Sequence, residues 1–186
     1  MDWMGLIKSL LQKPSEIPGV PALGASVSAP LGTGYTVPGA DLQSLLAGIP
    51  RIGLTKLGSP YGFGSKWPPL VANPMGKIDC SGFVRWCYWQ GAKFEIPDGS
   101  AQQFLASVPS LNPFPGDVGF FRKAGVIDHV GILCGHDVVE ARAFDPNASF
   151  LTGQVILRPR AVWEAWPEFT GWRRMIVVTQ KFGSLP

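Results

Sequence analysis

Residues that build disulfide frameworks and metal sites are scarce in this chain. Its 186 residues include three cysteines, at positions 80, 87 and 134, and two histidines, at positions 129 and 136. The cysteines form no CxxC pair and cannot all be joined to one another, so neither a disulfide framework nor a zinc knuckle is expected. At least one thiol therefore stays free, and we expect no metal and no organic cofactor.

Charged residues and long apolar runs are also few. The chain is 16% charged, and its formal net charge of +3 is too small to predict a nucleic-acid groove, although it suits an anionic polymer. Short basic clusters, RPR and WRR, are expected to be solvated surface. No run approaches the roughly eighteen apolar residues of a membrane span. The first 14 residues show no secretory signal, so export is expected to use another route unless a signal has been removed.

Apolar residues, glycine and proline are abundant by contrast. Hydrophobic residues make up 46% of the chain and include seven tryptophans and eleven phenylalanines, which is ample to fill a core. The 23 glycines and 18 prolines exceed average usage, predict many loops and short elements, and argue against a helical bundle. The length fits one domain with an appendage.

The first 40 residues predict that appendage. Apolar residues recur there at helical spacing and predict a short amphipathic helix: Trp3, Leu6, Ile7, Leu10 and Leu11. From Pro14 to about Gly39, proline, glycine and serine predict an extended linker or strap. We therefore divide the chain into residues 1–40 and a domain of residues 41–186. The apolar helix face is expected to pack on the domain or a partner subunit, or to dock on a carrier or a membrane surface. In a further alternative, the helix and strap cover the cleft in a resting state.

The domain sequence predicts helices first and strands afterwards. Asp41 can cap a helix, Pro50 should separate it from a second one, and a third should run from Cys80 to about Gln90, closed by Gly91. Short β-rich runs follow: VGFF, DHVGILCG, HDVVEARA, QVILRPR and RMIVVTQ. This order predicts an α+β fold with an antiparallel sheet.

One of the three thiols is placed to react. Cys80 follows Asp79, a natural N-cap, so it lies on the first helical turn, where unpaired N–H groups and the helix dipole favour a thiolate. Cys87 falls two turns later, in the aromatic body of the helix, and Cys134 points away from the strand face that bears His129. We predict that Cys80 is a nucleophile and that the other two cysteines are structural.

A cysteine nucleophile needs a base, and the two histidines differ in their settings. His129 opens the predicted strand HVGILC on the same face as Gly131 and Leu133, and the small Gly131 is expected to leave room for a substrate or a facing thiol. His136 falls in a predicted turn between Gly135 and Asp137, where a surface histidine is usual. We predict that His129 is the base.

A third residue is expected to orient the imidazole by accepting a hydrogen bond. If VVEAR pairs with HVGIL, then Val138, Glu140 and Arg142 share one strand face, and Glu140 is the natural candidate. In the alternative interpretation, Glu140 is an exposed strand carboxylate paired with Arg142 or Arg122. Asp128 should point to the opposite face of the strand and suits the role less well.

Five ordered motifs resemble those of the NlpC-type cell-wall cysteine peptidases: SPYGFGS, DCSGFV, GSAQQF, PFPGDVGFF and DHVGI. The resemblance covers roughly residues 57–140 and continues weakly to GWRR. It implies a papain-like core in which Cys80, at a helix N-terminus, packs on the sheet that carries His129. It also implies that Tyr61 lines the site near the oxyanion, and that Asp79 and Ser81 help to bind the free amino end of a peptide.

The chain departs from this family pattern in two places. Glu140 stands where many members carry a second histidine, so a carboxylate would take the third catalytic position. The paired glycines of the family become Gly64 and Ser65, followed by an insertion, KWPPLVANPMGK, at residues 66–77. Trp67 and the prolines of this insertion are expected to shape one rim of the cleft.

The resemblance implies a peptidoglycan hydrolase that cuts stem peptides, usually between D-glutamate and a diamino acid. Three alternatives stay open: an N-acetylmuramoyl-L-alanine amidase, another amidase or acyltransferase with the same cysteine and histidine, and an inactive wall-binding or phage structural module. Without a secretory signal, a wall-directed domain is expected to arrive by phage, lysis or specialised secretion. The sequence identifies neither the diamino acid, the host nor the oligomeric state.

Overall fold

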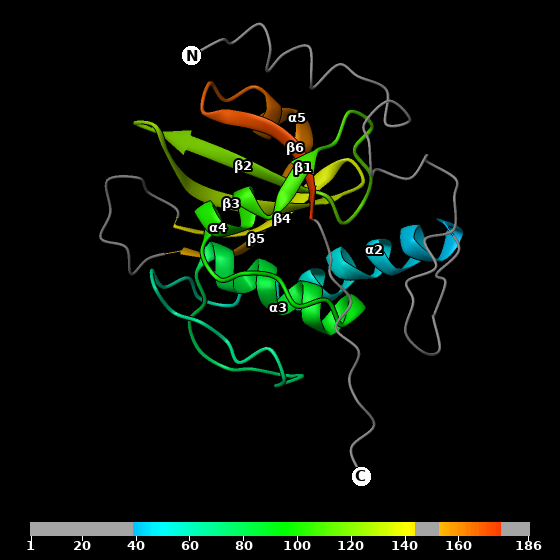
Figure 1. The fold of residues 1–186 in the computed structure, drawn as a ribbon. Coiled ribbons are helices and arrows are strands. Elements are labelled where there is room, and N and C mark those ends of the chain that lie inside the picture. Colours follow the sequence, from blue (N-terminus) through cyan, green and yellow to red (C-terminus); the bar gives the residue numbers. More distant parts are fainter. Residues whose placement is uncertain (1–38, 144–152, 176–186) are drawn as a thin grey trace, which may run out of the picture. The chain divides into compact units, whose positions relative to one another are not determined.

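The computed structural model describes residues 39–143 and 153–175, which Figure 1 traces along the chain. Its elements are α2 (Gly39–Leu54), α3 (Cys80–Ala92), α4 (Ser100–Leu105), β1 (Ser107–Pro109), β2 (Val118–Lys123), β3 (Val126–Cys134), β4 (Asp137–Ala143), β5 (Gly153–Pro159), α5 (Arg160–Glu164) and β6 (Phe169–Met175). The α+β prediction is confirmed. The amphipathic helix and strap predicted before residue 39 lie outside the described residues.

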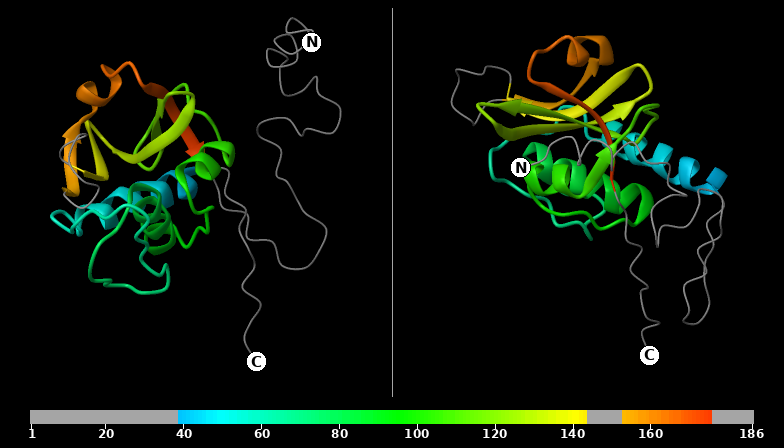
Figure 2. Two further views of the ribbon diagram at one scale, coloured as in Figure 1. Left: turned by 90° about the vertical axis from the view of Figure 1, so that its left-hand side faces the viewer. Right: turned by 45° about the horizontal axis from the view of Figure 1, so that its top comes forward.

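The strands form one antiparallel sheet in the order β1-β6-β2-β3-β4-β5. Helices α2 and α3 lie on one side of it and α5 on the other, as both views of Figure 2 show. The alternation of strand side chains fits this arrangement, because Ile132 joins the core that contains Phe83 of α3, whereas Leu133 packs with Trp163 of α5. The sheet therefore has an apolar layer on each face.

Close packing of α2 on α3 corrects two predictions about the helices. Pro50 does not separate two helices, because α2 continues through it to Leu54. In the part of α2 that precedes the proline, Leu46 and Ile49 are buried. Gly91 does not end α3, which continues to a left-handed residue, Lys93. A Cβ on Gly91 would lie 2.7 Å from the Cα of Ile49, so the glycine permits the close approach of the two helices.

The last strand begins earlier than predicted. The sequence predicted a strand at RMIVVTQ, residues 174–180, but β6 begins at Phe169, and residues 176–180 lie outside the described part of the chain. Within β6, Trp172 pairs with Gly119 of β2 and Met175 pairs with Ser107 of β1. The prediction rested on the apolar run Ile176–Val178. The start of β6 is instead set by its pairing with β2 and by the burial of Trp172.

Candidate active site

Cys80 is the first residue of α3, as the sequence predicted. Asp79 caps the helix, with its carboxylate accepting a hydrogen bond from the Gly82 N–H at 2.7 Å. The following turns bury Phe83 and Val84 in the core, which fixes the helix against the sheet. Cys80 itself is 7% exposed and lines a pocket, so its thiol is held at a helix N-terminus beside open space.

His129 of β3 lies between Cys80 and Glu140. Its side chain hydrogen-bonds the Cys80 side chain. Its Nε2 is 2.5 Å from Oε2 of Glu140, which leaves Nδ1 as the ring nitrogen for the thiol. The predicted pairing of β3 with β4 is present, with Leu133 opposite Val138. The side chains of the three residues predicted to be catalytic are therefore linked by hydrogen bonds in the order Cys80, His129, Glu140.

The contacts of His129 and Glu140 set their ionisation. Burial by itself lowers the pKa of the His129 imidazole, but the hydrogen bonds to Cys80 and Glu140 outweigh it and raise this pKa to about 9. Burial likewise raises the pKa of Glu140, yet its hydrogen bond to His129 and the nearby arginines lower it to about 2. Near neutral pH the pair is therefore an imidazolium and a carboxylate, and the imidazolium lies beside the Cys80 side chain.

Two residues from the C-terminal part of the domain hold Glu140, and the sequence analysis missed both. Arg158 of β5 donates from Nε to Oε1 of Glu140 at 2.8 Å, and Trp163 of α5 donates from Nε1 to the same oxygen at 3.0 Å. Arg142 lies farther away, with Nη1 3.8 Å from Oε2. Because Glu140 is fully buried, the exposed carboxylate considered as an alternative is wrong. Arg158 is partly exposed, with 25% of its side chain accessible, and its Nε reaches inward to the carboxylate.

Gly131 serves a different purpose from the one predicted. The sequence suggested that it leaves room for a substrate or a thiol, but a Cβ there would lie 2.7 Å from the indole ring of Trp163. Trp163 is fully buried and stacks on Phe121, whose ring in turn stacks on His129 with centroids 5.8 Å apart. The missing side chain therefore makes room for the tryptophan that holds Glu140.

Replacing Gly131 by alanine is expected to weaken both the fold and the site. The new methyl group must displace Trp163, which we expect to lower the free energy of unfolding by about 1–3 kcal/mol, as overpacking does. It should also lower kcat, because the indole N–H moves away from Glu140. Urea denaturation and peptide-release assays measure the two effects.

The matched control for this prediction is the double variant Gly131→Ala with Trp163→Phe. The smaller ring makes room for the methyl group and should recover part of the stability, but it lacks the indole N–H and should not recover kcat. Recovery of both quantities would mean that the Trp163 hydrogen bond has no part in the reaction.

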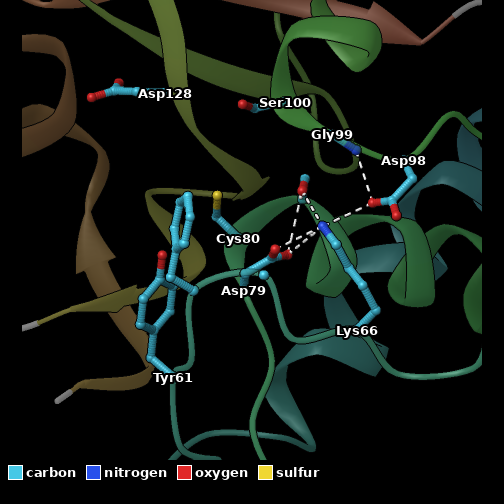
Figure 3. Close-up of a pocket in the computed structure, with 11 residues that line it drawn as sticks. Tyr61, Lys66, Asp79, Cys80, Asp98, Gly99, Ser100 and Asp128 are labelled. Atoms are coloured by element: carbon cyan, nitrogen blue, oxygen red, sulfur yellow. Dashed lines mark hydrogen bonds and ion pairs between the residues drawn. The ribbon is translucent and has the colours of Figure 1, made fainter. Parts of the chain in front are cut away.

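The pocket beside Cys80 has a volume of about 390 Å³ and brings together residues from distant parts of the chain (Figure 3). Tyr61, Asp79 and Ser81, the other predicted site residues, all line it. Tyr61 is buried, and this burial, with the negative charges of Cys80 and Asp79, raises the pKa of its hydroxyl. The phenol therefore stays protonated and can donate a hydrogen bond into the pocket.

Asp79 and Ser81 already have a cationic partner within the chain. Lys66, the first residue of the insertion, places its Nζ 2.7 Å from Oδ1 of Asp79 and 2.7 Å from the hydroxyl of Ser81. Asp98 lies 2.8 Å from the same nitrogen, and its pKa, which burial raises, is lowered overall by Lys66. Trp67 does not shape an open rim, because it is buried against Trp86 at a centroid distance of 5.2 Å.

The remaining cysteines and Asp128 differ in their surroundings. Cys87 is fully buried, which raises the pKa of its thiol, and burial and Asp137 raise that of Cys134. Asp128 reaches the wall of the pocket beside Cys80, because an irregularity in the β2–β3 register interrupts the regular alternation on which its predicted direction rested. The register passes from Phe121 opposite His129 directly to the pair Arg122 and Ile127.

Two further properties concern the described residues alone. Within residues 39–143 and 153–175, no cluster of three or more histidine, cysteine, aspartate or glutamate side chains is arranged to hold a metal ion. Among the helices described, none has the length and apolar character required to cross a membrane.

Comparison with known sequences identifies relatives. Residues 58–143 match the NlpC/P60 family. A probable endopeptidase of Corynebacterium glutamicum strain R is 32% identical over 120 residues, which are 63% of this chain and 51% of the relative. A second probable endopeptidase, from strain ATCC 13032 of the same species, is also 32% identical, over 63% of this chain and 50% of its own length. The chain thus spans about half the length of these curated relatives.

Solved structures share the fold. The peptidoglycan hydrolase RipB of Mycobacterium tuberculosis is 25% identical, with a TM-score of 0.55 over 79% of this chain and 74% of that one. RipD of the same organism, described as a non-catalytic NlpC/p60 domain protein adapted to peptidoglycan binding, is 18% identical, with a TM-score of 0.53 over 72% and 98%. The same fold therefore occurs in hydrolytic and in non-catalytic proteins. The fold alone does not separate the two classes, so any argument for catalysis must rest on the side chains of the site.

Proposed function

Residues 58–143 belong to the NlpC/P60 family, and from this premise we propose that the chain is a cysteine endopeptidase that hydrolyses peptidoglycan stem peptides. The observation that carries the proposal is the connected series Cys80, His129 and Glu140, in which a thiol, an imidazole and a buried carboxylate are in contact. A domain that only bound the wall would need neither a thiol at a helix N-terminus nor a carboxylate buried behind its base.

In the proposed reaction the Cys80 thiolate attacks the carbonyl carbon of a peptide bond. The oxyanion that forms accepts hydrogen bonds from the Cys80 backbone N–H and the Tyr61 hydroxyl, which stays protonated. The imidazolium of His129 gives its proton to the leaving amine as the carbon–nitrogen bond breaks, and a thioester remains. Neutral His129 then takes a proton from water, whose oxygen attacks the thioester carbon. The carbon–sulfur bond breaks, so a carboxylic acid and the Cys80 thiolate are released and His129 is again an imidazolium.

Glu140 supports both halves of this reaction through His129. A carboxylate that accepts from Nε2 keeps Nδ1 directed at the thiol and stabilises the positive charge of the imidazolium. Arg158 and Trp163 keep this carboxylate in place by binding its other oxygen. We regard Arg158 and Trp163 as positioning residues, since they act through Glu140.

We propose the bond between D-glutamate and the diamino acid as the one cut, and the cell wall as the place of action. The relatives named as probable endopeptidases support cleavage within the stem rather than at its junction with the glycan.

Digestion of purified sacculi followed by mass spectrometry tests the proposed function. We expect released peptides that begin at the diamino acid with a new amino group, and glycan that keeps stems ending in D-glutamate. Release of whole stem peptides with a free L-alanine amine would identify an amidase instead. Tight binding to sacculi without any soluble product would identify a wall-binding module and contradict the proposal.

A further inference from the structure

The ammonium group of Lys66 is bound by the pocket as a ligand would be. It lies 2.7 Å from each carboxylate oxygen of Asp79, 2.7 Å from the Ser81 hydroxyl and 2.8 Å from Oδ1 of Asp98. An ammonium has three N–H donors, and here each has an acceptor on a different residue. Figure 3 shows the contacts with Asp79 and Asp98 meeting at Nζ, in the pocket that Cys80 also lines. Two carboxylates and a hydroxyl around one ammonium form a complete binding site for an amine.

The surrounding chain holds Lys66 in this position. On its N-terminal side, the Ser65 carbonyl accepts from the Asp79 N–H at 2.8 Å. On its C-terminal side, Trp67 is buried against Trp86. The backbone at both ends of Lys66 is thus fixed to the segments that carry the acceptors.

Gly82 makes room for the aliphatic part of the lysine. A Cβ at Gly82 would lie 2.7 Å from the Cδ of Lys66, so the α3 backbone passes directly beside the side chain. The side chain of Lys66 is 31% exposed, that of Asp79 is 9% exposed and that of Asp98 is 44% exposed. The lysine is therefore partly exposed to solvent, whereas its acceptor Asp79 is almost completely buried.

We propose that Lys66 determines specificity by occupying the amine subsite formed by Asp79, Ser81 and Asp98. A free amino end then adds nothing to the affinity for a peptide, and the enzyme accepts peptides whose amino end is acylated. This inference rests on the proposed function, and it differs from the expectation that Asp79 and Ser81 bind a free peptide amine. Stem peptides still joined to the glycan have such an acylated amino end and are the substrate class that fits.

Competition between Lys66 and a substrate amine favours the lysine. A free amine that entered the subsite would have to replace three charge-assisted hydrogen bonds that Lys66 already makes. Lys66 is attached to the protein, so it loses no translational freedom when it binds, whereas a substrate does. The two groups also carry the same charge, so Lys66 repels an amine that approaches these acceptors.

Binding to the Cys80→Ala protein tests this inference without turnover. The probes are the dipeptide L-alanyl-γ-D-glutamate and its N-acetylated form, titrated by calorimetry. With Lys66 present, we expect the two dissociation constants to agree within about threefold. With Lys66→Met the carboxylates lose their cation, and the free-amine form should bind at least about tenfold more tightly than the acetylated form.

The matched control is Lys77→Met, which removes the exposed lysine at the other end of the same insertion and should leave both constants unchanged. Two results would overturn the inference. One is a tenfold or larger preference for the free amine while Lys66 is present. The other is the absence of such a preference in the Lys66→Met protein.

Lysine NMR provides a test that does not depend on the stability of Lys66→Met. In Cys80→Ala protein labelled with ¹³C at the lysine Cε, the Lys66 signal can be assigned by its loss in Lys66→Arg. We expect the free-amine dipeptide to leave this signal in place. Movement of the signal to the position of an exposed lysine would mean that the substrate displaces Lys66, which contradicts the inference. Neither test requires an active enzyme, so a failure here differs from a failure of the sacculus digest.

Discussion

Replacing Cys80 by alanine is expected to abolish release of soluble fragments from sacculi, with a loss in kcat/KM of at least roughly 10⁴-fold. The reason is that no other thiol can replace it: Cys87 is fully buried within α3, and Cys134 lies at the far end of β3 from His129. The fold should persist, since alanine suits the first turn of a helix and Asp79 still caps it. Product release followed by mass spectrometry measures the loss, and circular dichroism follows the fold.

The matched control for this substitution is Cys134→Ser, which changes a half-buried thiol that does not line the pocket. Its activity should stay close to that of the unmodified protein. If the Cys80→Ala protein still released stem fragments, the chemistry would have to come from a water molecule activated without covalent catalysis, and the proposed thioester would be excluded.

Replacing Glu140 by glutamine is expected to lower kcat by roughly 10²–10⁴-fold while keeping the shape of the side chain. The amide oxygen can still accept from Arg158 and Trp163. The amide nitrogen then faces Nε2 of His129 and donates to it. That contact places the imidazole proton on Nδ1, where it blocks transfer from the Cys80 thiol. Steady-state kinetics on a stem peptide measure the change, and KM should move much less than kcat.

The pH dependence of stability distinguishes this role from a merely structural one. The His129 pKa is raised, so its contribution to the free energy of unfolding is complete below about pH 6.5 and is lost as the pH rises through about 9. The Glu140 pKa is lowered, so its contribution is complete above about pH 4.5 and is lost as the pH falls through about 2. The stability difference between the unmodified protein and Glu140→Gln should therefore be largest between about pH 4.5 and 6.5.

Urea denaturation of both proteins at a series of pH values measures this difference. Taking the difference removes the titration of groups that both proteins share, such as Tyr61. A constant difference from pH 4 to pH 9.5 would mean that His129 and Glu140 do not form the ion pair described above. Such a result would also remove the electrostatic explanation for the lower kcat.

Local signals predicted the part of the site that lies close together in sequence. Asp79 and Cys80 are neighbours, so a cap followed by a helix sufficed to place the thiol on the first turn. His129 and Glu140 are joined by one hairpin, so strand alternation sufficed to bring them to the same face. The fold class could be predicted from the order of helical and β-rich segments, because each segment is recognised from its own residues. The catalytic roles of these residues remain predictions that the substitutions above test.

The missed residues depend on the order of strands and on insertions. Arg158 and Trp163 reach Glu140 only because β5 pairs with β4 and α5 then crosses the far face of the sheet. No periodicity within β5 or α5 indicates that arrangement. Lys66 was missed because an insertion has no pattern of its own. The contacts of its neighbours, Ser65 with Asp79 and Trp67 with Trp86, set its direction. Gly131 was misjudged for a related reason, since its neighbour Trp163 is 32 residues away in the chain.

The attachment of Glu140 to β5 and α5 also bears on when the protein becomes active during synthesis. The nucleophile, the base and the carboxylate are all present once the chain has been made to residue 140, but the two donors that hold the carboxylate follow later. Until Arg158 and Trp163 are in place, the carboxylate lacks the partners that allow it to be buried. If the proposed function is correct, we therefore expect a chain that ends before Arg158 to be inactive, and hydrolysis to begin only after β5 and α5 have folded onto the sheet.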